Sequence, residues 1–456
     1  MQADSRKIIS ENIVADRSKL KIICVFLYRI YFGRIPYEGQ YRGKKRKAMN
    51  ITELQQSYAS HPNVEGVCRL LKDNSVRHLY CGGLYASAAS LFSSVLVQRA
   101  TCPLVFILGD MEEAGYFYHD LTQILGTEQV LFFPSSFRRA IKYGQKDAAN
   151  EILRTEVLSR LQKGEEGLCV VTYPDALAEK VVSRKELGDN TLKLHAGERV
   201  DMNFVTDVLR SYGFEYVDYV YEPGQYAVRG SIIDVFSFSS EYPFRIDFFG
   251  DEVESVRTFE VETQLSKEKK ESIVIVPDLS HSLEKKGSGG MVSFLDFLPS
   301  DSLLAMRDFL WLRERIQTVH DESLTPQAIA ARESEENGAI TLEGKLIDGG
   351  EFTLRALDFR RMEFGNKPTG TPDATISFHT TVQPIFHKNF DMVAESFREY
   401  LSRHYTIYIC SDSLKQTDRI RAIFEDRGDN ISFTAVERTL HEGFADDTLR
   451  ICISQV

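Results

Sequence analysis

The sequence predicts an α/β protein: a parallel, helix-covered sheet of degenerate phosphate-loop type, interrupted by an inserted domain of mixed α+β and antiparallel texture, and followed by a further α/β domain. Three observations predict this class. Apolar strand-like runs alternate with amphipathic helical segments over residues 49–182, as in parallel sheets covered by helices. Short strand candidates between Gly, Pro and acidic turns replace this alternation over 183–264. The alternation returns over 265–325 and over 339–456, on either side of a polar linker at 326–338.

The first unit shows strands and helices in turn. Leu91 and its apolar neighbours have helical spacing and predict a helix over 85–98. Asp110 and the acidic residues after it suit the positive end of a helix dipole and predict a second helix. A third helix is expected over 147–163, closed by Gly164. Four short apolar runs have the length of buried strands: 77–81, 103–108, 130–133 and 168–172.

The inserted domain is predicted from short strands and turn residues. The turns include Glu222-Pro-Gly and Gly250-Asp-Glu, and one early helix is expected near 205–212. A strand at 272–276 follows the insert, and 291–319 returns to α/β texture as the remainder of the first domain. Five strand candidates lie within the insert: 215–220, 225–228, 231–236, 244–249 and 256–261.

The last unit begins with a helix over 389–403, in which Phe390, Val393 and Phe397 share one stripe. A strand at 405–410 and a helix ending near Asp426 follow, and the last strand is expected at 449–453. The chain ends three residues later. We therefore expect this third α/β domain to be truncated at its end, as a fragment of something longer.

Composition limits the classes of function. The net charge of the chain is −11, but residues 1–48 carry 12 Lys or Arg against 4 Asp or Glu. The remainder is strongly acidic and is no general nucleic-acid footprint. We expect 1–48 to be a basic extension, either disordered or upstream of a natural start at Met49. The apolar run that starts at Lys21 is interrupted by Arg29 before it could span a membrane.

The cysteines and histidines give no sign of a metal or disulfide framework. The seven Cys show no CxxC spacing, and the ten His form no HExxH or HxH cluster. We therefore expect reduced, mostly buried thiols and no metal site. We also expect a cytoplasmic monomer without membrane association.

A glycine loop without its lysine separates this chain from active nucleotide-binding folds. An apolar strand runs into Gly82 and Gly83 and then into a helix, the layout of a phosphate-binding loop. An active loop needs Lys for the β/γ-phosphates and a Ser or Thr for Mg²⁺. Small uncharged residues, including Ala86 and Ala88, stand there instead. The sequence therefore predicts no nucleotide cofactor and no catalytic residues in this chain.

Two blocks carry a family resemblance. They are Tyr221-Glu-Pro-Gly-Gln-Tyr-Ala-Val-Arg-Gly-Ser-Ile-Ile-Asp-Val-Phe and Pro243-Phe-Arg-Ile-Asp-Phe-Phe-Gly-Asp-Glu-Val-Glu-Ser-Val-Arg-Thr-Phe. Both resemble signature blocks that bacterial transcription-repair coupling factors share with the excinuclease protein UvrB. Two later blocks, Pro384-Ile-Phe-His-Lys-Asn-Phe and Thr439-Leu-His-Glu-Gly-Phe, resemble the third domain of the coupling factors and favour them over UvrB.

The resemblance, over about 49–453, implies a UvrB-like module with a degenerate nucleotide fold and an inserted domain that binds UvrA. The implied role is to recruit UvrA for transcription-coupled nucleotide excision repair. Contacts with RNA polymerase and DNA, and the ATP and Mg²⁺ of the motor, belong to family domains that this chain lacks. The alternatives are a UvrB-like ATPase that loads on DNA and an α/β interaction protein unrelated to repair.

The expected partner-binding residues are Arg229, Tyr226, Tyr216 and Glu222. Arg229 either pairs with a nearby carboxylate, Glu222 or Asp234, or meets an acidic surface of UvrA, and the two are compatible if the pair exchanges on binding. UvrB-type sequences carry further arginines where this chain has Tyr216 and Ala227.

The tyrosines of this block have two possible roles. Tyr216, Tyr219, Tyr221 and Tyr226 could form an aromatic contact patch, since Tyr is favoured at interfaces. Strand alternation would place some of them in the core instead.

Other polar groups have simpler interpretations. Acidic residues between 247 and 254 suit turns and exposed strand faces rather than catalysis, because no His or Lys is spaced with them. The basic and aromatic stretch 137–144 could touch a DNA backbone. His387-Lys388 and His441-Glu442 are expected to position loops in the third domain.

Overall fold

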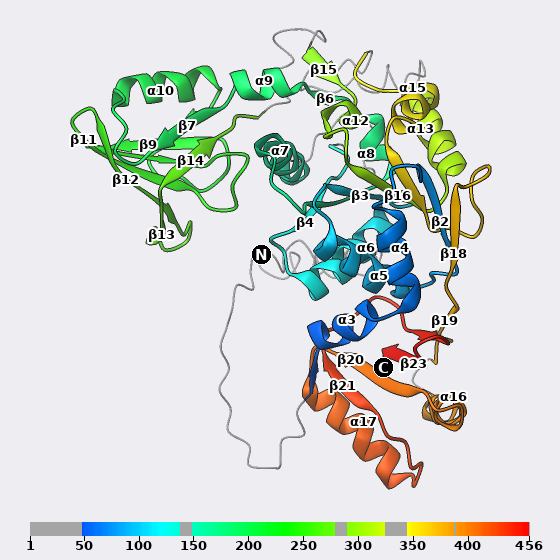
Figure 1. Cartoon of the computed structure of the whole chain (residues 1–456). Coiled ribbons are helices and arrows are strands. Elements are labelled where there is room, and N and C mark those ends of the chain that lie inside the picture. Colours follow the sequence, from blue (N-terminus) through cyan, green and yellow to red (C-terminus); the bar gives the residue numbers. More distant parts are fainter. Residues whose placement is uncertain (1–47, 137–147, 279–289, 324–343, 387–388, 456) are drawn as a thin grey trace, which may run out of the picture.

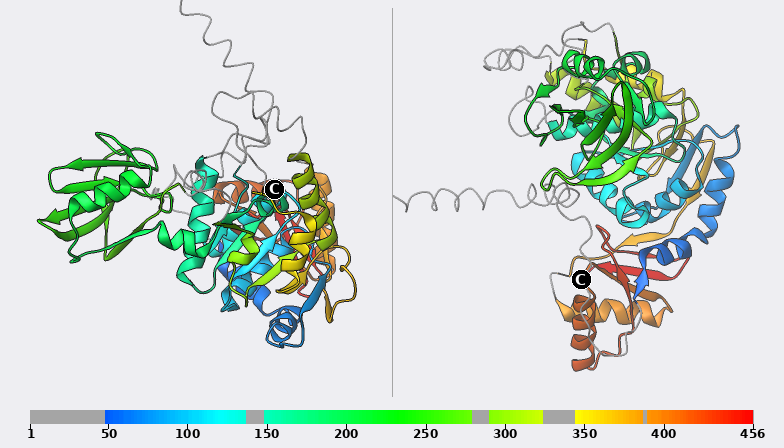
Figure 2. Two further views of the ribbon diagram at one scale, coloured as in Figure 1. Left: turned by 90° about the horizontal axis from the view of Figure 1, so that it is seen from above. Right: turned by 90° about the vertical axis from the view of Figure 1, so that its left-hand side faces the viewer.

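A computed structural model describes residues 48–136, 148–278, 290–323, 344–386 and 389–455. The basic extension, the stretch 137–144, the linker at 326–338 and His387-Lys388 lie outside these residues. The described chain forms a body with a long parallel sheet, an inserted domain that projects from one side, and a third layer below the body (Figures 1 and 2).

The body is built on a seven-stranded sheet whose neighbours are all parallel, in the order β18-β2-β17-β16-β3-β5-β4. This arrangement confirms the predicted α/β class. The strands are β2 (His78–Gly82), β3 (Leu104–Ile107), β4 (Val130–Phe132), β5 (Cys169–Thr172), β16 (Leu303–Met306), β17 (Arg360–Glu363) and β18 (Ala374–Ser377).

Helices pack around this sheet, and a short pair of strands, β6 (Val181–Val182) and β15 (Met291–Val292), lies beside it. Asp110 caps α6 as expected, because its carboxylate accepts the backbone N–H groups of Glu112 and Glu113 at 2.9 Å each. The helices are α3 (Ile51–Ala59), α4 (Pro62–Leu70), α5 (Ala88–Arg99), α6 (Met111–Leu125), α7 (Ala148–Lys163), α8 (Pro174–Ala178), α9 (Arg184–Asp189), α12 (Phe294–Phe297), α13 (Phe309–Ser323) and α15 (Gly349–Ala356).

The inserted domain is an antiparallel sheet in the order β13-β12-β11-β10-β9-β8, with only the β8–β9 pair parallel. A second sheet of β7 (Leu192–His195) and β14 (Ser272–Ile275) joins its two ends. One face of the larger sheet and α10 (Met202–Ser211) share a core. The other strands are β8 (Glu215–Tyr216), β9 (Gln225–Arg229), β10 (Ile232–Val235), β11 (Phe244–Phe249), β12 (Glu252–Phe259) and β13 (Ser266–Lys270).

The limits of the insert differ from the expected 183–264. Helix α9 belongs to the body, because Leu187 is buried in the core of the parallel sheet. Strands β13 and β14 lie beyond residue 264 yet complete the sheets of the insert. The insert is therefore closed by the pairing of its first strand with its last, Leu192 with Ile275 and His195 with Ser272.

The third layer is a six-stranded sheet in the order β1-β21-β20-β23-β22-β19. The expected domain boundary at 339 does not separate it from the body. Strands β17 and β18, which follow that boundary, belong to the seven-stranded sheet, and β1 joins the six-stranded one. The elements of this layer are β1 (Met49–Asn50), β19 (Thr380–Val382), α16 (Phe390–Ser402), β20 (Thr406–Ser411), α17 (Leu414–Asp426), β21 (Thr434–Glu437), β22 (Phe444–Asp446) and β23 (Ile451–Gln455).

Two further features follow from the described residues. None of their helices is long and apolar enough to cross a membrane. Their six cysteines are all free, and four of them are buried. Burial raises the pKa of the Cys410 thiol to about 12, so this thiol stays protonated at neutral pH.

Candidate partner-binding surface

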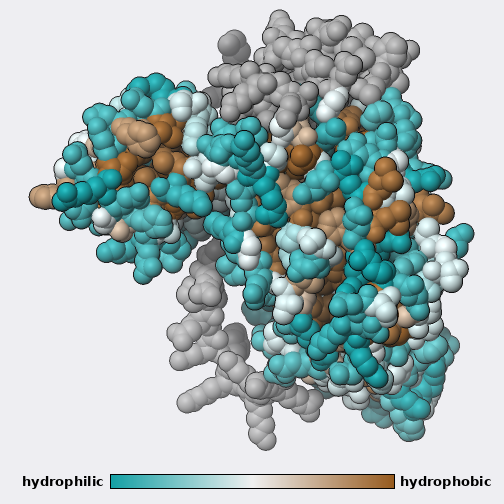
Figure 3. Space-filling view, turned by 45° about the horizontal axis from the view of Figure 1, so that its top comes forward, coloured by the Kyte–Doolittle hydropathy of each residue, from teal (hydrophilic) through white to brown (hydrophobic). Residues whose placement is uncertain are grey.

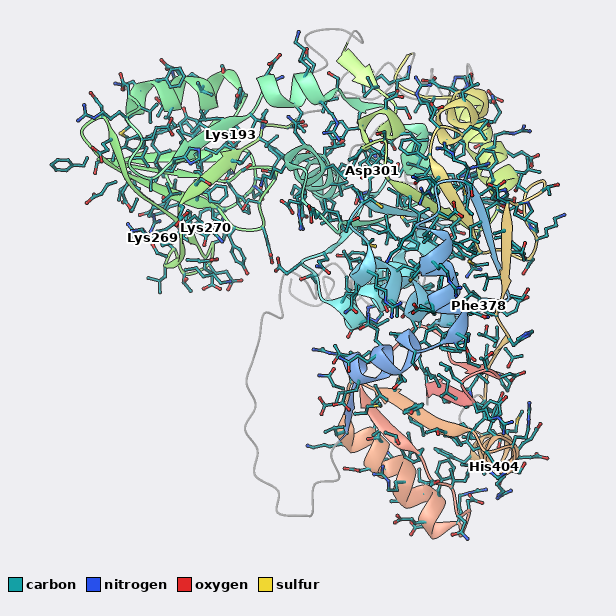
Figure 4. All side chains as sticks on the ribbon, in the orientation of Figure 1. Lys193, Lys269, Lys270, Asp301, Phe378 and His404 are labelled. Atoms are coloured by element: carbon teal, nitrogen blue, oxygen red, sulfur yellow. The ribbon has the colours of Figure 1, made fainter. Side chains whose placement is uncertain are left out.

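The glycine loop of the body lies between β2 and α5, as the sequence predicts. Gly83 has φ +76°, and a Cβ there would lie 2.1 Å from the carbonyl oxygen of Phe378, so only glycine fits. Phe378 lies where the chain passes from β18 to β19, at the junction of the two sheets (Figure 4). The loop is therefore shaped around the third layer of this protein.

Three residues of the loop region are bonded to that layer. The Tyr85 backbone N–H donates to Thr380 Oγ1 at 3.0 Å, and the Thr380 hydroxyl donates to the Gly83 carbonyl at 2.7 Å. The Glu442 backbone N–H donates to Ser87 Oγ at 3.0 Å. We call these contacts, together with the contact of His441 with Asp120, the loop junction.

A cleft of about 330 Å³ opens beside the loop junction, and its lining is acidic. Asp120 is fully buried at its base, where burial raises the pKa of its carboxyl to about 6. The His441 backbone N–H donates to Asp120 at 2.6 Å, and the His441 ring stacks on Tyr116 with centroids 3.4 Å apart. The carboxylates of the lining are Asp110, Glu112, Glu113, Asp120 and Glu442, with Arg307 paired to Glu113. Such a lining disfavours the polyphosphate of a nucleotide.

His441 and Glu442 thus hold the third layer against the loop and α6, rather than only shaping a loop of their own layer. Sequence reasoning missed this role, because the contact joins residues more than 300 positions apart, as between His441 and Asp120.

Arg229 lies at the end of β9 on the face of the insert that turns away from α10. Its guanidinium forms an ion pair with Asp234, whose side chain is fully buried. Of the two pairings that the sequence left open, the structure contains the one with Asp234. The Arg229 guanidinium also lies 4.9 Å from the centre of the Tyr219 ring, within cation–π range.

Asp234 has a second partner that sequence reasoning missed. Arg245 Nε donates to Asp234 Oδ1 at 2.8 Å and Arg245 Nη2 donates to Oδ2 at 2.9 Å. These hydrogen bonds raise the pKa of the Arg245 guanidinium. The available signal was the alternation of Phe244-Arg-Ile-Asp-Phe, which places Arg245 and Asp247 on the face opposite to the core. The register then pairs Asp234 directly with Arg245.

The tyrosines of the block divide between surface and core. Tyr216, Tyr219 and Tyr221 are 60%, 52% and 56% exposed. Tyr226 is only 2% exposed and packs edge-on against Tyr216, with ring centroids 5.5 Å apart and an interplanar angle of 69°. We therefore leave Tyr226 out of the contact surface. Tyr216, its direct partner on β8, lies on the same face of the sheet as Tyr226, the face that shares a core with α10. Figure 3 shows apolar side chains reaching the surface of the insert among polar ones.

Glu222 lies in an exposed turn beside this surface. The backbone N–H of Glu222 donates to Gln225 Oε1 at 3.1 Å, and the same turn contains Gly224 at φ +87°. Its carboxylate makes no ion pair among the described residues.

Of the acidic residues between 247 and 254, Asp251, Glu252 and Glu254 are exposed. Asp247 accepts the hydroxyl of Ser255 at 2.8 Å and pairs with Arg257 across the strands. Within the part of the chain that the structure describes, no group of three or more His, Cys, Asp or Glu could hold a metal ion.

Comparison with known proteins confirms the resemblance. Residues 192–281 match the family of the UvrB interaction domain. The chain is 29% identical to the transcription-repair-coupling factor of Escherichia coli K12 over 43% of this chain and 17% of that protein. It is 30% identical to that of Bacillus subtilis 168 over 43% and 16%, and 22% identical to that of Staphylococcus aureus RF122 over 80% and 35%. The matches thus span about a third or less of these relatives.

Proposed function

We propose that this chain, which is similar to transcription-repair coupling factors, recruits UvrA for transcription-coupled nucleotide excision repair in the cytoplasm, through the inserted domain. The observation that carries the proposal is Arg229. It is a partly exposed guanidinium on a domain that matches the UvrB interaction family. Arginine and tyrosine are the side chains most often found at the energetic centres of protein interfaces.

The surface around Arg229 fits such a contact. The Tyr219 ring lies against its guanidinium and is itself half exposed. Tyr216 is also exposed, but it pairs with Tyr226 on the face of the sheet that shares a core with α10. Its partner Asp234 is buried and therefore hidden from UvrA. A carboxylate on UvrA would meet a cation flanked by a ring, the combination that gives bidentate and stacked contacts at once.

The proposal gives the body no nucleotide chemistry. The loop junction engages the backbone N–H of Tyr85 and the hydroxyl oxygen of Ser87, and the cleft beside it is acidic. Both observations argue against the rival function, a UvrB-like ATPase that loads on DNA. We assign no contact with RNA polymerase or DNA to this chain.

The test is the affinity of UvrA for the full chain and for Arg229→Ala. Removing one partner of a desolvated charge pair costs about 2–5 kcal/mol, so the affinity should fall at least about tenfold. The fold should persist, because Asp234 keeps both hydrogen bonds to Arg245. Arg210→Ala is the matched control. Arg210 is 68% exposed on α10, pairs with Asp207 of the same helix, and lies over the opposite face of the sheet.

Two outcomes separate the interpretations. A tenfold loss for Arg229→Ala with wild-type binding by Arg210→Ala supports the proposal. A lower melting temperature with unchanged UvrA affinity would mean that Arg229 serves only to neutralise Asp234.

A further inference from the structure

Two guanidinium groups share one buried carboxylate in the inserted domain. Asp234 has no exposed side-chain surface, and both Arg229 and Arg245 bond to it. The two arginines come from different strands, β9 and β11, on either side of β10. The cluster of these three residues therefore carries a net positive charge at neutral pH.

The net positive charge of this cluster is unusual in an acidic domain. Residues 192–278 contain 17 Asp or Glu and 9 Lys or Arg. The domain has enough acidic residues for each arginine to pair with its own. A shortage of carboxylates therefore does not explain why two arginines share Asp234.

The two arginines use Asp234 differently. Arg245 occupies both carboxylate oxygens, through Nε at 2.8 Å and Nη2 at 2.9 Å. Its remaining Nη1 donates to the Gln264 carbonyl at 3.1 Å, and its guanidinium lies 4.5 Å from the centre of the Phe259 ring. Every nitrogen of the Arg245 guanidinium is therefore engaged, and its side chain is only 16% exposed.

Arg229 makes the less complete contact with Asp234. Only its Nη2 donates to Asp234, on the oxygen that Arg245 Nη2 already shares. Its Nη1 reaches the Asp218 carbonyl at 3.5 Å, the limit of a hydrogen bond, and its side chain is 35% exposed. Since a guanidinium has five N–H donors, Arg229 keeps donors for another acceptor.

We propose that Arg245 is a positioning residue for partner recognition. By occupying both oxygens of Asp234, it prevents Arg229 from closing its own bidentate pair, and so leaves Arg229 charged and open to a carboxylate of the partner. Without Arg245, Arg229 would turn both branches of its fork onto Asp234 and lose that charge and those donors. This inference rests on the proposed function, because it assigns the recognition of UvrA to the same surface.

The first experiment is a double-mutant cycle on the full chain, with UvrA affinity as the readout. Arg245→Met should weaken binding about tenfold or more, the loss typical of one charge-assisted hydrogen bond. In the Arg229→Ala background the same change should weaken binding no further, because Arg245 acts through Arg229. An equal loss in both backgrounds, or no loss in either, would overturn the inference.

Arg257→Met is the matched control. Arg257 lies on β12, directly opposite Arg245, so its replacement by Met removes the same charge from the same face. Arg257 pairs with Asp247 and does not touch Asp234. Its variant should bind UvrA more tightly than Arg245→Met. Equal weakening would show that only the total charge of the face matters.

Arg245→Lys separates charge from geometry and also serves if the Met variant does not fold. Lysine keeps the charge but cannot form the bidentate fork. UvrA affinity should still fall, because Arg229 gains the vacated oxygen. Wild-type affinity of this variant would refute the fork argument.

The second experiment needs no UvrA. With ¹⁵N-labelled arginine, the Nε–H signal of Arg229, assigned by its loss in Arg229→Ala, should shift and exchange more slowly in Arg245→Met or Arg245→Lys. An unchanged signal would overturn the positioning role. A shifted signal together with normal UvrA binding by Arg229→Ala would instead sustain the positioning role and refute the proposed function.

Discussion

Replacing Asp120 by Asn should stabilise the protein at neutral pH, although the substitution removes a charge from a hydrogen-bonded site. Asp120 accepts the Ser90 hydroxyl at 2.9 Å and the His441 backbone N–H at 2.6 Å, so it links α5 and the third layer. Burial raises the pKa of its carboxyl to about 6; hydrogen bonds from Ser87, Ser90 and His441 oppose that rise, and Glu442 adds to it.

The size of the effect follows from the pKa difference. In the unfolded chain an Asp titrates near 3.8, and in the folded protein this one titrates at about 6. As pH rises through this window, the unfolded state ionises first, so the free energy of unfolding falls and stays low above it. A difference of about two pKa units corresponds to about 3 kcal/mol. Asn cannot ionise, and its amide can still accept from His441 and donate to the serine hydroxyls.

The assay is urea unfolding of the wild type and of Asp120→Asn at several pH values between 4 and 7.5. The variant should gain about 2 kcal/mol over the wild type between the two ends of this range, because the unfolded Asp is already partly ionised at pH 4. Hydrogen exchange of the His441 amide, which donates to Asp120, should slow by a matching factor at pH 7.5. A stability difference that does not change with pH would refute the reasoning.

Asp373→Asn is a control in which the change in stability is expected to have the opposite sign. Asp373 accepts the backbone N–H groups of Arg77 and His78 at 2.8 Å each, and these bonds lower the pKa of its carboxyl. Its stabilisation is therefore present above the unfolded pKa and lost as pH falls. The variant should be less stable than the wild type at neutral pH, and the difference should shrink toward acid.

Three further predictions concern other parts of the chain. A chain that begins at Met49 should melt like the full chain, whereas removal of Met49 and Asn50 should lower the melting temperature, since it deletes β1 and the cap of α3. ATP with Mg²⁺ should give no thermal shift and no hydrolysis, and a shift of several degrees would revive the ATPase alternative, because a ligand must stabilise the fold that binds it. Tyr58→Phe should lower the free energy of unfolding by about 1–3 kcal/mol, since it removes a buried hydrogen bond of 3.1 Å to Asp446; an unchanged midpoint in urea would contradict this.

Local sequence signals predicted the elements well where an element depends on its own residues. The strand that ends at the paired glycines forms as β2, and Asp110 caps the helix expected after it. The helix expected over 389–403 forms as α16, with Asn389 as its cap rather than its first residue. The start of α5, which was expected over 85–98, was predicted three residues early, because Ala86 adopts φ +51° and the loop continues to Ser87.

Non-local pairing could not be predicted in the same way. Nothing in the four-residue sequences of β17 and β18 indicates whether they join the seven-stranded sheet or the six-stranded one. At the candidate surface, alternation alone gave Tyr226 two possible sides, and only the register of β9 with β10 places it in the core. The sharing of Asp234 by two arginines depends on three neighbouring strands, so it could not be predicted from the sequence either.

The position of β2 in its sheet has a consequence for synthesis of the protein on the ribosome. Both neighbours of β2 come late: the strand ends at Gly82, whereas β17 begins at Arg360 and β18 at Ala374. At 5–20 residues per second, that gap of roughly 280 residues lasts about 15–60 s. An apolar strand thus waits without backbone partners while the insert, whose first and last strands pair with each other, can already close. Nascent chains paused before residue 360 should therefore be the form of this protein that chaperones bind most strongly.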